Sequence, residues 1–379
     1  MKRRICGAAL ALLCCFSLTG CWNYRGLNDL DIVTGIAVDR NPETGLYDLT
    51  FEIADTQNAG AEDEIAAKYV QAQGETIFDT IRNSKKRLIN KLYGGNLQTV
   101  IISHQIAEQD GVSSVLEELL RDGEPRETLS VVISQEDTAR EILLTEGIDS
   151  KIIAYEINEM IREDSRVTAS TKNLPLYQAY NAIRGPGGSL VLPAARCIEN
   201  NGQNAAEVNG IALFLKDRLI GYETPENTLY YLFIMDELQN GVISFPVTDP
   251  DESVSMQIKS SKASTGVSYE NGQLSVALHL KIKLNVMEVK GQLAISQAQQ
   301  REQLEVLTEQ MISLRISEFF HEIQTRVGVD IFGLGKLLYQ KEPEVWRSVE
   351  ADWESLFQKA SLSVAVEADV ISSGVMKDY

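Results

Sequence analysis

The residues most often used for catalysis and metal binding are few in this chain and lie far apart. Its only histidines are His104, His279 and His321. None of them stands in an HExxH, HxxE or paired-histidine motif, the spacings that place two ligands on one face of a helix. The sequence therefore predicts no metal site, and we expect each histidine to be an ordinary polar or half-buried residue.

Motifs for nucleophiles and phosphates are equally weak. No GxSxG motif occurs, and Cys197 has no neighbouring signature of a catalytic thiol, so we expect it to be a small packed residue. The segment DIFGLGK ends like a phosphate-binding loop, but Asp330 stands where that loop needs a glycine and Leu337 where it needs a hydroxyl group. The segment DPDES begins like a calcium loop, but Val254 replaces the glycine of its turn. We expect no catalytic residue, no cofactor and no enzymatic activity.

The strongest local signal lies at the N-terminus. Three basic residues, Lys2 to Arg4, precede an apolar run from Ile5 to Leu18. A helix of that length covers about 21 Å, which is short of a hydrocarbon core of roughly 30 Å, so the run is typical of a signal peptide. The next residues, LTGC, resemble a bacterial lipobox, in which the cysteine receives diacylglycerol and the peptide before it is removed. We expect residues 1–20 to be cleaved and Cys21 to be lipidated; an ordinary secretory signal or an uncleaved anchor helix are the alternatives.

The amino-acid composition limits the partners that the chain after Cys21 can bind. The chain has 54 acidic and 35 basic residues and a net charge of −19, which becomes −22 when the three basic residues of the signal peptide are removed. Nucleic acid is therefore an improbable partner, because phosphate binding needs clustered basic residues. No apolar run long enough to span a membrane follows Cys21. We expect an ectodomain held at the membrane by its lipid, without an intrachain disulfide, since Cys197 is the only other cysteine left.

Hydrophobic periodicity predicts a multi-domain α+β fold. Alternating helical and strand patterns indicate a mixed α/β domain over residues 21–200, and a short hairpin and helix indicate a small middle unit over residues 201–245. Residues 246–379 are predicted to form a C-terminal α+β domain with antiparallel strands and one long helix over residues 294–327. Two boundary signals are expected in the middle of the chain: the glycine and proline stretch Gly185–Gly188, and the polar run ENNGQNAAE at residues 199–207.

Taken together in their order, several segments give the chain a resemblance to the Ger(x)C family, the C-subunit lipoproteins of spore germinant receptors. The resemblance covers nearly the whole mature chain and is carried by LTGCWNYRGLNDLDIVTGIAVD, YGGNLQTVIISHQIA, RDGEPRETLSVVIS, NGIALFLKDRLIG and VDIFGLGKLLYQKEPEVW. The last of these is the most specific. An acidic residue often follows the Cys-Trp pair in this family, whereas Asn23 and Tyr24 follow it here.

The resemblance implies a three-domain ectodomain tethered through Cys21 to the outer face of the inner spore membrane. It also implies two integral-membrane partners, the A and B subunits, in a complex that senses nutrients and starts germination without catalysis. The residues matching the C-terminal signature of the family are Asp330, Phe332, Gly333, Gly335 and Trp346. The family gives these five no established role, and we expect them to be structural: glycines that separate two helices, with an aromatic residue packed across the bend.

Two functions follow from these observations. The first is a non-enzymatic receptor subunit whose lipid raises its effective concentration near membrane partners. The alternative is a lipid-anchored extracytoplasmic solute-binding protein, which would need a cleft lined by aromatic and charged groups.

Overall fold

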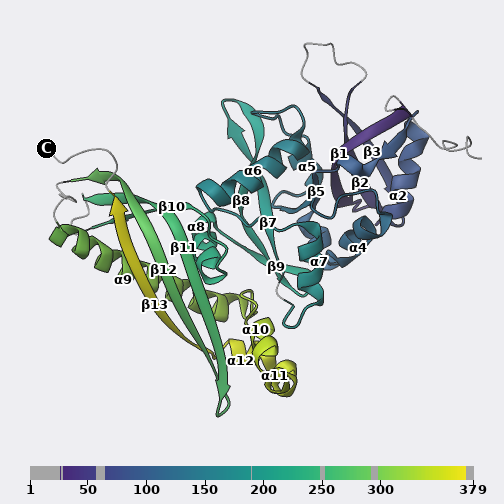
Figure 1. Cartoon of the computed structure of the whole chain (residues 1–379). Coiled ribbons are helices and arrows are strands. Elements are labelled where there is room, and N and C mark those ends of the chain that lie inside the picture. The colour runs from purple at the N-terminus through teal and green to yellow at the C-terminus, as the bar shows by residue number, and fades with distance from the viewer. Residues whose placement is uncertain are drawn as a thin grey trace, which may run out of the picture.

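The computed structural model describes residues 26, 29–56, 65–188, 190–247, 252–291 and 298–372, and these residues build two β-sheets with helices packed on them (Figure 1). Cys21 and the predicted signal peptide lie outside the described residues. Within the described ranges no helix is both long and apolar enough to cross a membrane. The strands of the first sheet lie at one end of the molecule and the long strands of the second sheet at the other (Figure 1).

The first sheet has nine strands in the order β3-β2-β1-β5-β6-β7-β8-β9, with β4 paired beside β1. The central pairs β1–β5, β5–β6 and β6–β7 are parallel and the outer pairs are antiparallel. Its strands are β1 (Leu30–Arg40), β2 (Tyr47–Ala54), β3 (Ala67–Gly74), β4 (Lys91–Tyr93), β5 (Thr99–Ile102), β6 (Ser130–Ser134), β7 (Val191–Asn200), β8 (Gln203–Leu215) and β9 (Arg218–Glu223). The two central strands β5 and β6 are buried along their whole length, as expected of parallel strands that are covered on both faces.

Helices cover both faces of the first sheet. One face carries α2 (Ile77–Ser84), α3 (His104–Gln109), α4 (Ser113–Asp122) and α7 (Leu176–Arg184), whose apolar residues share one hydrophobic cluster with the strands. The other face carries α5 (Ala139–Leu143) and α6 (Ile153–Val167), which build a separate cluster. The sheet is therefore the middle layer of a three-layer unit.

The second sheet has four strands in the order β10-β11-β12-β13, namely Gly241–Pro246, Ser253–Glu270, Gln273–Lys290 and Ser361–Ser372. Asn271 and Gly272 join β11 to β12 with φ values of 53° and 83°, the left-handed geometry that a tight hairpin turn requires. The helix α9 (Ala298–Glu322) packs against the buried face of this sheet through Leu304, Ile312, Ile316, Phe319 and Phe320. Polar residues occupy the other face.

The last strand, β13, pairs in parallel with β12, whereas the other pairs of this sheet are antiparallel. Side chains of α9 accept hydrogen bonds from the outer edge of β13. The backbone N–H groups of Ala368 and Val370 donate to Glu309 Oε1 and Glu305 Oε1, both at 2.9 Å. These carboxylates take the place of a further strand.

Short helices connect α9 to β13. The turn η4 (Ile323–Val327) continues α9 as a π-helix and stops at Gly328, whose φ is 72°. The next helices are α10 (Leu334–Lys341), α11 (Pro343–Val349) and α12 (Trp353–Phe357). The predicted long helix over residues 294–327 is thus α9 plus one π turn from residue 298 on; residues 292–297 lie outside the described residues.

The α+β fold class is confirmed by this architecture. The expected boundary at residue 200 lies inside the hairpin β7–β8, whose strands pair across it from Asn200 and Gln203 outward. The hairpin β8–β9, expected in a middle unit, is likewise part of the nine-stranded sheet. The strands therefore form two sheets rather than three separate groups, and the division of the chain into domains stays a prediction.

Candidate functional site at the junction of the two sheets

The helix α8 (Pro225–Ile234) connects the two sheets and is buried on almost every side. Thr224 caps it by accepting the N–H of Asn227, and Pro225 occupies its first turn. Its side chains share one hydrophobic cluster with Val191 and Ile211 of the first sheet and with β11, β12 and α9 of the second. A helix that is apolar all round is packed on all sides. The two sheets are thus joined through a common core.

Asp330 organises the loop that carries the family signature. It is only 1% exposed, and its carboxylate accepts the N–H of Phe332 at 2.9 Å, the N–H of Gly335 at 2.9 Å and the indole N–H of Trp353 at 3.2 Å. Burial raises the pKa of Asp330, while these hydrogen bonds act in the opposite direction. The carboxylate fixes the start of α10 and ties it to α12.

Phe332 lies at the centre of an aromatic cluster. Its ring centroid is 5.2 Å from that of Phe320, 5.8 Å from Phe319, 6.2 Å from Tyr231 and 6.3 Å from Phe357. Stacked and edge-on pairs at these separations are favourable. The cluster joins α8, α9 and α12 around the signature loop.

The two signature glycines serve different needs. Gly333 precedes α10 with φ 67°, a conformation that costs other residues energy. Gly335 has no room for a side chain, because a Cβ atom there would lie 2.8 Å from Cζ3 of Trp346 and 3.2 Å from Cα of Gly187. Gly187 belongs to the loop after α7, so the backbones of the two sheet units meet at this point.

A buried lysine lies near this contact. Lys172 Nζ donates to the Tyr231 hydroxyl at 3.0 Å and pairs with a Glu237 carboxylate oxygen at 2.8 Å. It also lies 5.0 Å from the centre of the Tyr231 ring. Burial disfavours the ammonium form, but Tyr231 and Glu237 outweigh it and raise the pKa of Lys172.

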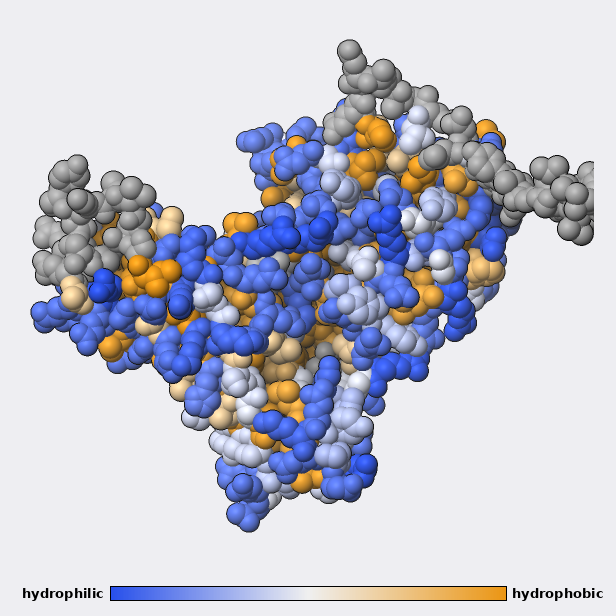
Figure 2. Space-filling view, in the orientation of Figure 1, coloured by the Kyte–Doolittle hydropathy of each residue, from blue (hydrophilic) through white to orange (hydrophobic). Residues whose placement is uncertain are grey.

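These groups line a cavity of about 360 Å³ between α7 and α10, with Gln178, Asn181, Tyr231, Glu237 and Lys336 in its wall. A second, more open hollow of about 490 Å³ lies beside it and includes Lys216, Trp346 and Glu354. Figure 2 shows the surface hollowed between the two sheet units. A few polar groups beside apolar side chains are typical of a pocket that can hold a small polar molecule.

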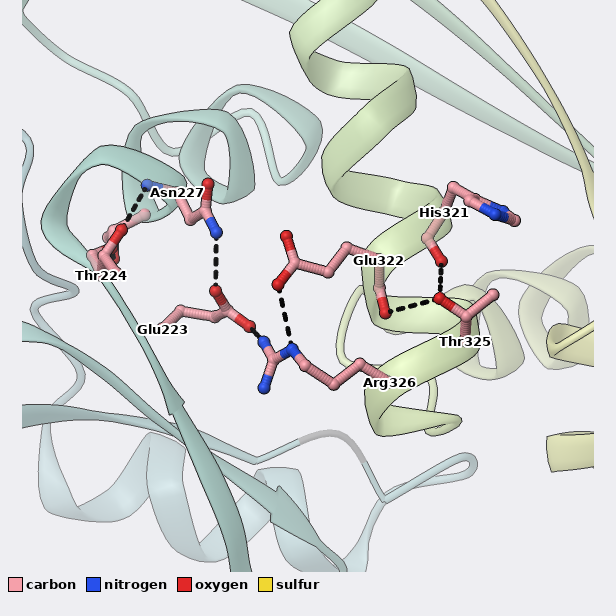
Figure 3. A network of polar contacts seen from close by, with 8 residues as sticks. Glu223, Thr224, Asn227, His321, Glu322, Thr325 and Arg326 are labelled. Atoms are coloured by element: carbon pink, nitrogen blue, oxygen red, sulfur yellow. Dashed lines mark hydrogen bonds and ion pairs between the residues drawn. The ribbon is translucent and has the colours of Figure 1, made fainter.

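A partly buried ion pair also links the two sheets (Figure 3). Glu223, at the end of β9, has a side chain only 2% exposed and pairs with the guanidinium of Arg326 in η4. Asn227 donates a second hydrogen bond to Glu223 at 2.8 Å, and Arg326 also donates to Glu322 at 2.9 Å. Burial raises the pKa of Glu223, and Asn227 and Arg326 oppose that shift. The pair joins the first sheet to the helix of the second.

The structure brings together Asp330, Phe332, Gly333, Gly335 and Trp346 around the start of α10, with Trp346 contributed by α11. It leaves the histidines apart: His104 lies in α3, where Nδ1 is 2.8 Å from the carbonyl oxygen of Glu136, and the other two lie in β12 and α9. Within the described ranges no group of three or more metal-ligating side chains converges.

Sequence reasoning missed the ion pairs of the junction, which join Lys172 to Glu237 and Glu223 to Arg326. They come from segments far apart in the chain. Two sequence signals lie at the junction, the Gly185–Gly188 stretch and the signature segment, and they meet where Gly187 contacts Gly335.

Two family descriptions match the chain in sequence order. Residues 23–196 match "Spore germination protein N-terminal domain", and residues 209–374 match "Spore germination B3/ GerAC like, C-terminal". Relatives are similar over nearly their whole length. Spore germination protein GerQC of Bacillus cereus is 24% identical over 99% of both chains, and spore germination protein KC of Bacillus subtilis (strain 168) is 21% identical over 93% of this chain and 92% of its own.

The fold also matches a solved structure. The crystal structure of the GerBC protein superposes with a TM-score of 0.59, at 18% identity, over 89% of this chain and 97% of that one. At this identity the match establishes a shared fold.

Proposed function

Because the chain belongs to the Ger(x)C family of spore germination proteins, whose N-terminal and C-terminal domains it carries in order, we propose that it is the lipid-anchored C subunit of a nutrient germinant receptor. In this proposal it acts without catalysis, beside integral-membrane A and B subunits, to trigger germination. Its place is the outer face of the inner spore membrane.

The observation that carries the proposal is the completeness of the match. Both domains are present, and relatives that are themselves spore germination proteins align over nearly their full length. The chain thus has the parts of a whole family member rather than one borrowed domain.

The tether at Cys21 completes the proposal. Two or more acyl chains hold a protein stably on a bilayer. Confinement to a thin layer raises the effective concentration of the ectodomain for membrane partners. The junction described above supports a scaffolding role, since its buried carboxylates Asp330 and Glu223 are engaged by backbone N–H groups, an indole and a guanidinium.

The test is affinity purification of the tagged chain from detergent-solubilised spore membranes, with mass spectrometry of the proteins that copurify. We expect two polytopic membrane proteins in the eluate. Recovery of the chain alone, in a detergent that preserves other membrane complexes, would overturn the proposed partnership.

A second candidate is the solute-binding protein considered above, and the cavity beside Lys172 favours it. Its test is the melting temperature of the purified chain with individual amino acids and sugars. A saturable rise that is lost in Lys336→Glu, a change in the cavity wall, would support solute binding. No shift with any compound at millimolar concentration would leave the receptor-subunit role as the sole proposal.

A further inference from the structure

One short segment departs from the acidic character of the chain. Residues 82–91, RNSKKRLINK, contain five basic residues and no acidic one, in a protein of net charge −19. The segment runs from the end of α2 through the turn η2 (Lys85–Arg87) to the first residue of β4. We call residues 85–89 of this segment the basic loop.

The basic loop has a defined shape and an exposed apolar tip. Lys85 Nζ donates to the carbonyl oxygens of Ile89 and Asn90, the latter at 2.8 Å, and Lys86 Nζ donates to the Asn83 side chain at 2.8 Å. The side chains of Lys85, Lys86 and Arg87 are exposed. Ile89 is 96% exposed, the largest value among the exposed large hydrophobic residues of the described ranges. A lone exposed isoleucine is unremarkable, but this one stands among three cations.

Nearby carboxylates neutralise only part of the basic segment. Lys91 pairs with Glu124, and Arg82, which lies over the Phe78 ring at 4.8 Å, shares a surface hollow with Asp122 and Glu124. In the described part of the chain, no carboxylate forms an ion pair with the three cations of the basic loop. Three positive charges therefore remain at its tip.

Strand pairing places the basic loop at the end of the sheet where β1 begins. β4 pairs in parallel with the start of β1, with Lys91 opposite Leu30. Because parallel strands enter a sheet from the same end, the residues just before Lys91 and those just before Leu30 leave from that end. Cys21 lies nine residues before Leu30 (30 − 21), so its reach from β1 is at most roughly 30 Å.

We infer that the basic loop makes a second, non-covalent contact with the membrane: Lys85, Lys86 and Arg87 bind anionic lipid headgroups and Ile89 enters the interface. The inference rests on the proposed tether at Cys21. Basic residues close to a bilayer are attracted to anionic lipids, and an apolar side chain among them adds interfacial binding. The acidic remainder of the molecule is repelled by the same surface. The contact therefore orients the ectodomain with the N-terminal end of β1 toward the lipid.

Native lysines provide the test. The lipidated full chain is bound to vesicles of phosphatidylcholine alone or with phosphatidylglycerol, and treated with a membrane-impermeant acetylating reagent. Mass spectrometry then gives the acetylation rate at each lysine. We expect Lys85 and Lys86 to react at least fivefold more slowly on the anionic vesicles than in detergent. The control is Lys262, whose side chain is 79% exposed on the second sheet and whose rate should not change.

Two double variants test whether the positive charge of the basic loop, rather than closeness to the vesicle alone, protects Lys85. Lys86→Glu combined with Arg87→Glu should restore the reactivity of Lys85 while the lipid still holds the chain on the vesicle, and high salt should do the same in the wild type. The matched control is Lys281→Glu combined with Lys283→Glu on β12, which should leave the protection of Lys85 intact.

The outcomes distinguish this inference from the proposed function. Binding to the vesicles is measured by flotation. If the wild-type protein floats with neither kind of vesicle, both the proposed tether and this inference are wrong. Flotation without protection of Lys85 and Lys86 would overturn the inference alone. Protection that appears in spore membranes but not in anionic vesicles would assign the loop to a protein partner and also overturn it.

Discussion

The backbones of Gly187 and Gly335 touch across the junction of the two sheets: a Cβ atom on Gly335 would lie 3.2 Å from the Cα of Gly187 and 2.8 Å from the ring of Trp346. The contact joins the loop after α7 to the start of α10. Gly335 is therefore a point at which the packing of the whole chain can be tested by adding a single methyl group.

We expect Gly335→Ala to lower the free energy of unfolding by about 1–3 kcal/mol, because the added methyl group overpacks the contact with Trp346. Denaturant unfolding of the purified chain measures the change. The control is Gly221→Ala, since nothing lies within 4 Å of a Cβ atom at Gly221. Unchanged stability of Gly335→Ala together with loss of partner binding would instead make the signature loop an interaction site.

Removal of Arg326 should loosen the junction. Arg326→Ala leaves the Glu223 carboxylate without its ion-pair partner, and we expect the free energy of unfolding to fall by about 1–3 kcal/mol, since the Arg326 side chain itself is 46% exposed. The control is Arg315→Ala, whose exposed pair with Glu318 lies within α9 and should change stability by less than about 0.5 kcal/mol. Equal effects of the two substitutions would show that the junction pair contributes nothing beyond a surface contact.

Lys172→Met should destabilise the fold, because it leaves the buried hydroxyl group of Tyr231 without its hydrogen-bond partner. The substitution removes the ammonium that meets Tyr231 and Glu237. Glu237 is 40% exposed and can be hydrated, but the Tyr231 hydroxyl is buried and loses its partner. We expect a loss of about 1–3 kcal/mol in the free energy of unfolding. The double variant Lys172→Met with Tyr231→Phe should recover part of that loss, and a still larger loss would contradict the explanation.

The carboxyl group of Asp39 should give stability a distinct pH dependence. Burial raises its pKa from 3.8 to about 6, although it accepts the N–H groups of Ala139 at 2.7 Å and Arg140 at 3.0 Å. The folded state therefore binds a proton more tightly than the unfolded state between these two pH values. Relative to Asp39→Asn, the wild type should lose about 2 kcal/mol of stability as the pH rises from 4 to 6. Parallel stability curves for the two proteins would refute this.

Cys21→Ser should separate anchoring from folding. The described fold begins after Cys21, so we expect a normally folded chain that leaves the membrane fraction and no longer supports germination. The matched control, Cys197→Ser, should remain in the membrane fraction. Fractionation of spore membranes and a germination assay measure both effects, and a membrane-bound, active Cys21→Ser protein would rule out the tether.

Local signals predicted the second sheet better than the first. The turn at Asn271 and Gly272 fixes the hairpin β11–β12, because both residues adopt positive φ and alternating side chains follow on either side. The same dipeptide at Asn201 and Gly202, with φ 54° and 82°, is also a hairpin turn, but its polar surroundings made it a predicted boundary. Local composition cannot distinguish a linker from a turn between paired strands.

The junction could not be predicted, because its contacts join residues far apart in the chain. Lys172 meets Glu237, and Glu223 meets Arg326, 103 positions further along the sequence. Each of them is a charged residue of a type common on protein surfaces. The packing of the two sheets buries Lys172 and Glu223, whereas Glu237 and Arg326 stay partly exposed. The edge strand β3 was missed for a related reason: only Ala72 and Gly74 are buried in it, so its sequence reads as polar.

The parallel pairing of β12 with β13 sets an order of folding. β13 is the last described strand, and its partner ends 71 positions before it begins (361 − 290). Until the end of the chain has been made and has folded back, the long strand β12 has an open edge that can pair with other chains. Closing so large a loop is slow compared with forming the local β11–β12 hairpin. The second sheet is therefore expected to be the slowest part of the molecule to fold and the part most exposed to aggregation before folding is complete.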